Sequence, residues 1–104
     1  MKYIKLGAVR AFTRVAPDKA QALKPLEEAA EVFGAWQQRD PRDVTHIGYA
    51  TAKLLDEIAD TIQACCNLAS ALGVEDLTPY LARCEERNRE RGRYDKEGSE
   101  DGRA

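Results

Sequence analysis

Two stretches with a helical pattern dominate this chain, LEEAAEVFGAW at residues 26–36 and LLDEIADTIQAC at residues 54–65. In both, apolar residues recur at intervals of three and four, which is the period of an α-helix with one buried face. Each stretch also carries two acids three residues apart, and residues at this spacing are neighbours on a helix surface. These pairs are Glu28 with Glu31, and Glu57 with Asp60. Two such helices packed face to face would gather four carboxylates.

Four carboxylates in one partly buried space repel one another and cannot all stay ionised without a cation. Carboxylate oxygens are the ligands that Mg²⁺ prefers. We therefore expect Mg²⁺, or Mn²⁺ in its place, and a metal held this way predicts a phosphate-bearing ligand. Such a metal lowers the pKa of a bound water, and a carboxylate that is not a ligand can take the proton. Which of the four acids would act as the base is left open.

The first acidic stretch belongs to a helix expected over residues 25–38. Its apolar residues form one stripe that we expect to be buried, made of Leu26, Ala29, Phe33 and Trp36. Of these, Trp36 is assigned to the core or to a dimer interface. Pro17 and Asp18 are typical of a helix start, whereas Pro25 interrupts a helix. Residues 18–24 are therefore either a short lead-in helix or part of one helix kinked at Pro25.

The second acidic stretch lies within a longer helix. Asp43 is the expected N-cap, and the helix should reach about Leu72 and end at Gly73. Beside its apolar stripe runs a line of polar residues, His46, Lys53, Glu57, Asp60 and Asn67. Polar residues that recur beside a core stripe indicate a lined site.

A third helix is expected from about Thr78 to Arg91, because Thr followed by Pro is an N-cap and N1 signature. Asn88 occupies a position of its inner stripe where the pattern calls for an apolar residue. Since a buried Asn without partners is costly, this position favours a functional contact. Residues 95–104 are polar and aperiodic, so we expect a disordered tail.

Composition limits the class of protein. A chain of 104 residues makes one domain with a modest core, so oligomerisation is expected. A net charge of −2 argues against nucleic acid and anionic membranes as partners. No secretory h-region is present, and no stretch approaches the roughly 18 apolar residues of a membrane span. We therefore expect a cytoplasmic protein, whose cysteines Cys65, Cys66 and Cys84 are reduced and buried.

The order of these motifs resembles the MazG-like family of all-α nucleoside triphosphate pyrophosphohydrolases. The matching stretches are LKPLEEAAEV at 23–32, LLDEIADTIQ at 54–63, NLASALGVEDL at 67–77 and ERNRERGRY at 86–94. The resemblance covers residues 23–94 and leaves residues 1–22 without a counterpart or an assigned structure. It implies an all-α bundle of three main helices, completed by dimerisation into a four-helix core, as a homodimer or homotetramer. The implied reaction converts a nucleoside triphosphate into a monophosphate and pyrophosphate with Mg²⁺.

Site residues follow from the chemistry and the resemblance together. Both acidic pairs, Glu28, Glu31, Glu57 and Asp60, are expected to bind metal and to be catalytic. Lys53 either contacts a phosphate or forms a salt bridge with the acids, and Asn88 is expected to hydrogen-bond the sugar or a phosphate. Further phosphate-binding candidates are Lys24, Arg91, Arg93 and Tyr94.

Two alternatives stay open. The chain could bind nucleotide and metal as a sensor without hydrolysing them. It could instead be a helical interaction module, in which the acids are an ordinary solvated face and the apolar stripes bind a partner helix. No residue in the sequence identifies the nucleobase.

Overall fold

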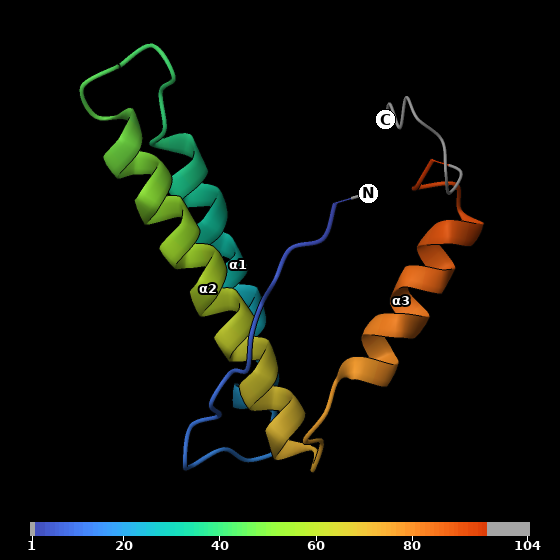
Figure 1. The fold of residues 1–104 in the computed structure, drawn as a ribbon. Coiled ribbons are helices and arrows are strands. Elements are labelled where there is room, and N and C mark those ends of the chain that lie inside the picture. Colours follow the sequence, from blue (N-terminus) through green and yellow to red (C-terminus); the bar gives the residue numbers. More distant parts are fainter. Residues whose placement is uncertain (1, 96–104) are drawn as a thin grey trace. The chain divides into compact units, whose positions relative to one another are not determined.

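The computed structural model describes residues 2–95, and in this part of the chain all regular structure is helical, without strands. Three helices follow one another, α1 (Lys19–Gln37), α2 (Ile47–Ala71) and α3 (Thr78–Glu90). The chain divides into two compact units (Figure 1). One is residues 8–74 with α1 and α2, and the other joins residues 2–7 to residues 75–95 with α3. The all-α class is thus confirmed. Among residues 2–95, no helix combines the length and the hydrophobicity that a membrane span requires.

Helix α1 is one continuous helix that passes through Pro25. Its N-cap is Asp18, whose extended backbone leaves the side-chain Oδ1 free to accept the N–H of Gln21 at 2.9 Å. The helix therefore begins where Pro17 and Asp18 predict it, and the choice between a separate lead-in helix and one longer helix is resolved in favour of one helix. Part of the N-terminal segment that had no assigned structure belongs to α1.

Two predicted N-caps are wrong, those of α2 and α3. Helix α2 begins at Ile47 after a turn, and Asp43 accepts the N–H of His46 at 3.3 Å within that turn. Thr78 is the first residue of α3, after Leu77 as N-cap, and its N–H is donated to Asp76 Oδ1 at 2.9 Å. A cap must lie just outside the helix, so Thr78 cannot serve as one.

The predicted end of α2 at Gly73 is confirmed. Gly73 has a φ of +83°, in the left-handed region that glycine adopts without steric cost. Its N–H is donated to Ser70 O at 2.9 Å, and the N–H of Val74 to Ala69 O at 3.0 Å. This pair of bonds is a Schellman motif, which satisfies carbonyls that would otherwise lack partners at the helix end.

Helices α1 and α2 lie side by side, joined by residues 38–46 (Figure 1). Extended residues before α1 are held against α2 by side-chain amides. Gln63 Nε2 donates to Arg10 O at 2.9 Å, and the Phe12 N–H is donated to Asn67 Oδ1 at 3.0 Å. We call residues 8–16 the N-terminal strap. Because an extended single strand has no ladder partner, these amides supply hydrogen bonds that its backbone would otherwise lack.

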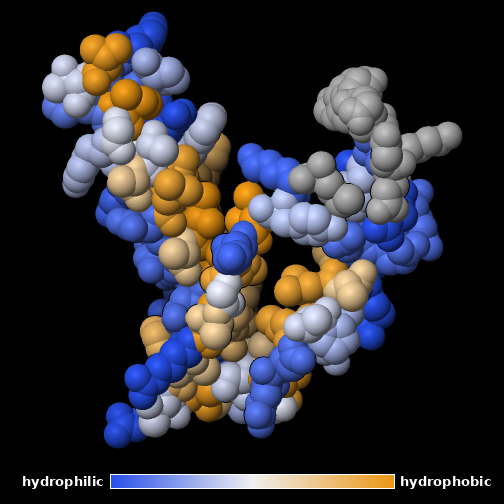
Figure 2. All heavy atoms as spheres, in the orientation of Figure 1, coloured by the Kyte–Doolittle hydropathy of each residue, from blue (hydrophilic) through white to orange (hydrophobic). Residues whose placement is uncertain are grey.

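The expected burial of the α1 stripe is wrong for a single copy of the chain. Leu26, Phe33 and Trp36 are between 55% and 67% exposed. Among the described residues only Ala64 and Asn67 are buried, with 6% and 3% of their surface exposed. Two helices and a strap leave the outer side of each helix uncovered, and Figure 2 shows apolar side chains at the surface of the α1–α2 pair.

The expected burial of the cysteines is also wrong, since Cys65 and Cys84 are exposed and Cys66 is half-buried. All three thiols are free. The prediction for a disordered tail falls on residues 95–104, of which only Asp95 lies within the described residues.

We predict that Asp18→Ala lowers the free energy of unfolding by about 1 kcal/mol, because the Gln21 N–H loses its acceptor. Urea denaturation followed by helical circular dichroism measures the change. Asp18→Asn keeps a side-chain oxygen at the same position and should retain most of the stability. Equal stability of the alanine variant and the wild type would show that this cap does not contribute.

Candidate functional site

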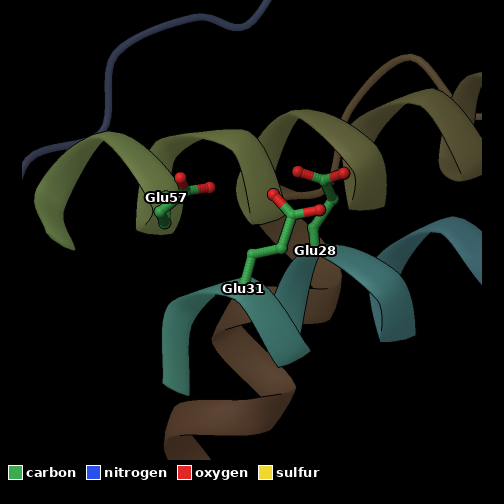
Figure 3. A group of neighbouring side chains, drawn as sticks. All are labelled: Glu28, Glu31 and Glu57. Atoms are coloured by element: carbon green, nitrogen blue, oxygen red, sulfur yellow. The ribbon is translucent and has the colours of Figure 1, made fainter. Parts of the chain in front are cut away.

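Three of the four predicted acids come together between the two long helices. Glu28 and Glu31 project from α1 toward α2, which contributes Glu57 (Figure 3). One carboxylate oxygen from each lies within 4.8 Å of the others. Glu28 and Glu57 are half-buried, and Glu31 is exposed. We call these three residues the acidic trio.

Asp60, the fourth predicted acid, lies outside the acidic trio and is exposed. It follows Glu57 by one turn of α2, so both belong to the same helix face. Its charge still acts on Glu31, although it is the weakest of the influences on that residue. Asp60 also lines a groove together with Glu28.

Charge repulsion raises the pKa of Glu31 above its usual value of 4.5. The charge of Glu28 is the largest cause, followed by that of Glu57 and by partial burial. Each of these influences disfavours the ionised carboxylate. At neutral pH the acidic trio therefore concentrates negative charge, which favours the uptake of a proton or a cation.

Glu57 carries a polar atom that the fold leaves unsatisfied. Its side chain is 12% exposed, and Oε2 forms a salt bridge with Lys53 Nζ at 3.4 Å. The other oxygen, Oε1, is inaccessible to solvent and has no hydrogen-bond partner. It is the one such side-chain polar atom among residues 2–95. A buried acceptor without a donor is costly, and a cation bound between the carboxylates would satisfy it.

Lys53 forms a salt bridge with Glu57, which is one of the two contacts expected for it. Its side chain is 56% exposed, so water screens much of this ion pair. Lys24 pairs with Glu27 at 3.2 Å and lines the groove next to Glu28. Neither lysine neutralises the acidic trio as a whole.

The unit that holds α3 contains four of the predicted substrate-binding residues, Asn88, Arg91, Arg93 and Tyr94. Asn88 is half-buried and its Nδ2 lies 3.6 Å from Cys84 Sγ, while Arg91 and Tyr94 are exposed. Their role toward the acids stays a prediction.

The groove adjoins the acidic trio within the unit of residues 8–74 and has a volume of about 820 Å³. The strap and both long helices line it, with Glu28, Asp60 and Asn67 among the residues of its wall. The sequence placed Asn67 in a line of polar residues but gave it no role. Its contact with Phe12, 55 residues away in the chain, is a tertiary feature that helical periodicity does not encode.

We predict that Glu31→Gln stabilises the metal-free protein at pH 7. Because the folded-state pKa of Glu31 is raised, the stability from this group is present below pH 4.5 and is lost as the pH rises through the folded pKa. Glutamine removes that loss, so the variant should have a higher melting temperature than the wild type at pH 7 and an equal one near pH 4.

Mg²⁺ provides the complementary measurement. It should raise the melting temperature of the wild type at pH 7 and raise that of Glu31→Gln much less. Asp56→Asn removes an exposed acid of α2 outside the acidic trio and should respond to Mg²⁺ like the wild type. Identical melting and identical Mg²⁺ responses for Glu31→Gln and the wild type would contradict repulsion within the trio.

Comparisons with known proteins leave the family of this chain open. No protein-family model, no curated protein and no solved structure matches it. The acidic trio and the groove beside it are the features of this chain that bear on its function.

Proposed function

We propose that this protein is a Mg²⁺-dependent nucleoside triphosphate pyrophosphohydrolase, which converts a ribo- or deoxyribonucleoside triphosphate into a monophosphate and pyrophosphate. The observation that carries this proposal is the acidic trio, in which one oxygen of Glu57 is inaccessible to solvent and has no hydrogen-bond partner. Such a donor set fits a hard divalent cation, for which carboxylate oxygens are the preferred ligands. The order of acidic motifs in the sequence supports the same conclusion.

In this proposal Glu28, Glu31 and Glu57 hold Mg²⁺, which when bound would polarise the phosphate and acidify a water. Asp60 is the acid outside the trio, and its exposed carboxylate can accept a proton from the attacking water. The water oxygen forms a bond to the α-phosphorus, and the bond from that phosphorus to the bridging oxygen breaks. Pyrophosphate leaves with the bridging oxygen, and the nucleoside monophosphate keeps the water oxygen.

We propose further that the active form is a homodimer or homotetramer. Leu26, Phe33 and Trp36 expose apolar surface along α1, and soluble monomers rarely leave large contiguous apolar patches open. A second α1–α2 pair packed on this surface would create the four-helix core that the family resemblance implies. Trp36 also has the guanidinium of Arg39 at 5.8 Å from its ring centroid, a contact that such an interface would desolvate.

The same exposed apolar residues favour one other function, that of a helical interaction module for a different protein. In that case the chain alone would be monomeric, and no nucleotide would be turned over. Oligomeric state and product analysis therefore separate the two functions.

We predict that the protein with Mg²⁺ releases monophosphate and pyrophosphate from a subset of nucleoside triphosphates, resolved by chromatography of all phosphate products. Glu57→Gln should lower the rate by at least about 100-fold, because loss of a metal ligand costs no less than loss of an outer-shell partner. Asp56→Asn, on the preceding residue, should retain the wild-type rate. Full activity of Glu57→Gln would refute the metal assignment, and no turnover with Mg²⁺ or Mn²⁺ would favour the interaction module.

We predict that Phe33→Glu converts the oligomer into a monomer, because a charge replaces an apolar side chain at the centre of the α1 stripe. Size-exclusion chromatography with light scattering measures the mass. Val44→Asp adds a charge at a residue that is 83% exposed in the loop before α2 and should leave the mass unchanged. A wild-type protein that is already monomeric would contradict the four-helix core.

A further inference from the structure

Asn67 in the groove is the most deeply buried polar residue of the described chain, with 3% of its surface exposed. Its Oδ1 accepts two hydrogen bonds, from the Phe12 N–H at 3.0 Å and from Gln63 Nε2 at 2.9 Å. Both donors are N–H groups, so they determine which end of the amide is oxygen. The Nδ2 end is therefore fixed as a pair of donors.

No described residue accepts a hydrogen bond from Asn67 Nδ2. In residues 2–95, Glu57 Oε1 is the one side-chain polar atom that has neither solvent access nor a hydrogen-bond partner. Asn67 Nδ2 has no partner either, so it must retain some solvent access. The amide thus presents N–H groups to the groove that it lines. A nearly buried donor without an acceptor indicates a place for a ligand acceptor.

The position of Asn67 relative to the acids suits a nucleotide. Asp60 and Asn67 are seven residues apart on α2, which corresponds to about 10 Å along the helix axis. Both line the same groove, and the buried Ala64 lies between them. A nucleotide spans a comparable distance from the edge of its base to its 5′-phosphate, so one ligand can reach both residues.

We propose that this groove is the subsite for the base of the nucleotide, and that Asn67 Nδ2 donates a hydrogen bond to a carbonyl oxygen on the base. This inference rests on the proposed function. Both acceptor positions of Oδ1 are occupied, so Asn67 offers only donors to the ligand. A base that turns an amino group toward Asn67 places donor against donor. The groove therefore selects keto bases, uracil over cytosine and hypoxanthine over adenine.

The test uses titration calorimetry with Mg²⁺ present. It measures the affinity of the protein for the non-hydrolysable α,β-imido nucleoside triphosphates of these four bases. Inorganic triphosphate is the probe without a base. In the wild type we expect each keto analogue to bind at least tenfold more tightly than its amino counterpart. Asn67→Asp keeps the acceptor for Phe12 and Gln63 but loses both donors, so it should abolish this preference and leave the affinity for inorganic triphosphate unchanged. Gln37→Glu adds the same charge at an exposed residue outside the groove and should behave like the wild type.

A measurement on the wild type alone covers the case in which Asn67→Asp fails to fold. The side-chain amide signals of Asn67 in a nitrogen-15 NMR spectrum should shift with the keto analogues and stay in place with inorganic triphosphate. Equal affinity for all four bases, or a base preference that survives in Asn67→Asp, would overturn the inference and leave the proposed function intact. If neither inorganic triphosphate nor any analogue binds, both are overturned.

Discussion

Mutual repulsion among the carboxylates at the α1–α2 contact determines the electrostatics of the acidic trio. Packing of the two helices holds oxygens of Glu28, Glu31 and Glu57 within 4.8 Å of one another. Lys53 offsets part of the charge, but its exposure weakens the ion pair. The remaining repulsion raises the pKa of Glu31. Among residues 2–95, no group donates a hydrogen bond to Glu57 Oε1. A bound cation would therefore contribute to folding as well as to chemistry.

The second polar contact joins the strap to the groove. Gln63 and Asn67 use their side-chain amides to hold the backbone of residues 10–12 on α2. Gln63 Nε2 donates both to Arg10 O and to Asn67 Oδ1, so the two amides and the strap form one network. Such a network fixes amide orientation, and an amide with a fixed orientation can discriminate between donors and acceptors on a ligand. The contacts that hold the strap thus also define the chemistry of the groove wall.

Local signals in the sequence predicted the helices well. The cap at Asp18, the helix end at Gly73 and the spacing of the acidic pairs each involve residues only three or four positions apart. Asp43 and Thr78 misled the prediction of caps, since competing turns before α2 and α3 depend on backbone geometry that residue type does not encode. Burial of the α1 stripe could not be predicted, because periodicity identifies an apolar face but not what covers it. For Asn67 the missing information was its partner Phe12, which lies far away in the chain.

Helix α2 carries several residues of the site at regular intervals along one face. Lys53, Asp60 and Asn67 recur every seven residues, so they lie nearly in line on one face of the helix, with Glu57 beside them. A cation, two anions and a neutral amide therefore follow one another at separations that a single helix fixes. Under the proposed function, the charged end of a nucleotide would meet the acids and its base would meet the amide. Base recognition and metal binding would then share one rigid element, so a ligand whose base fits the groove would also have its phosphates positioned at the acids.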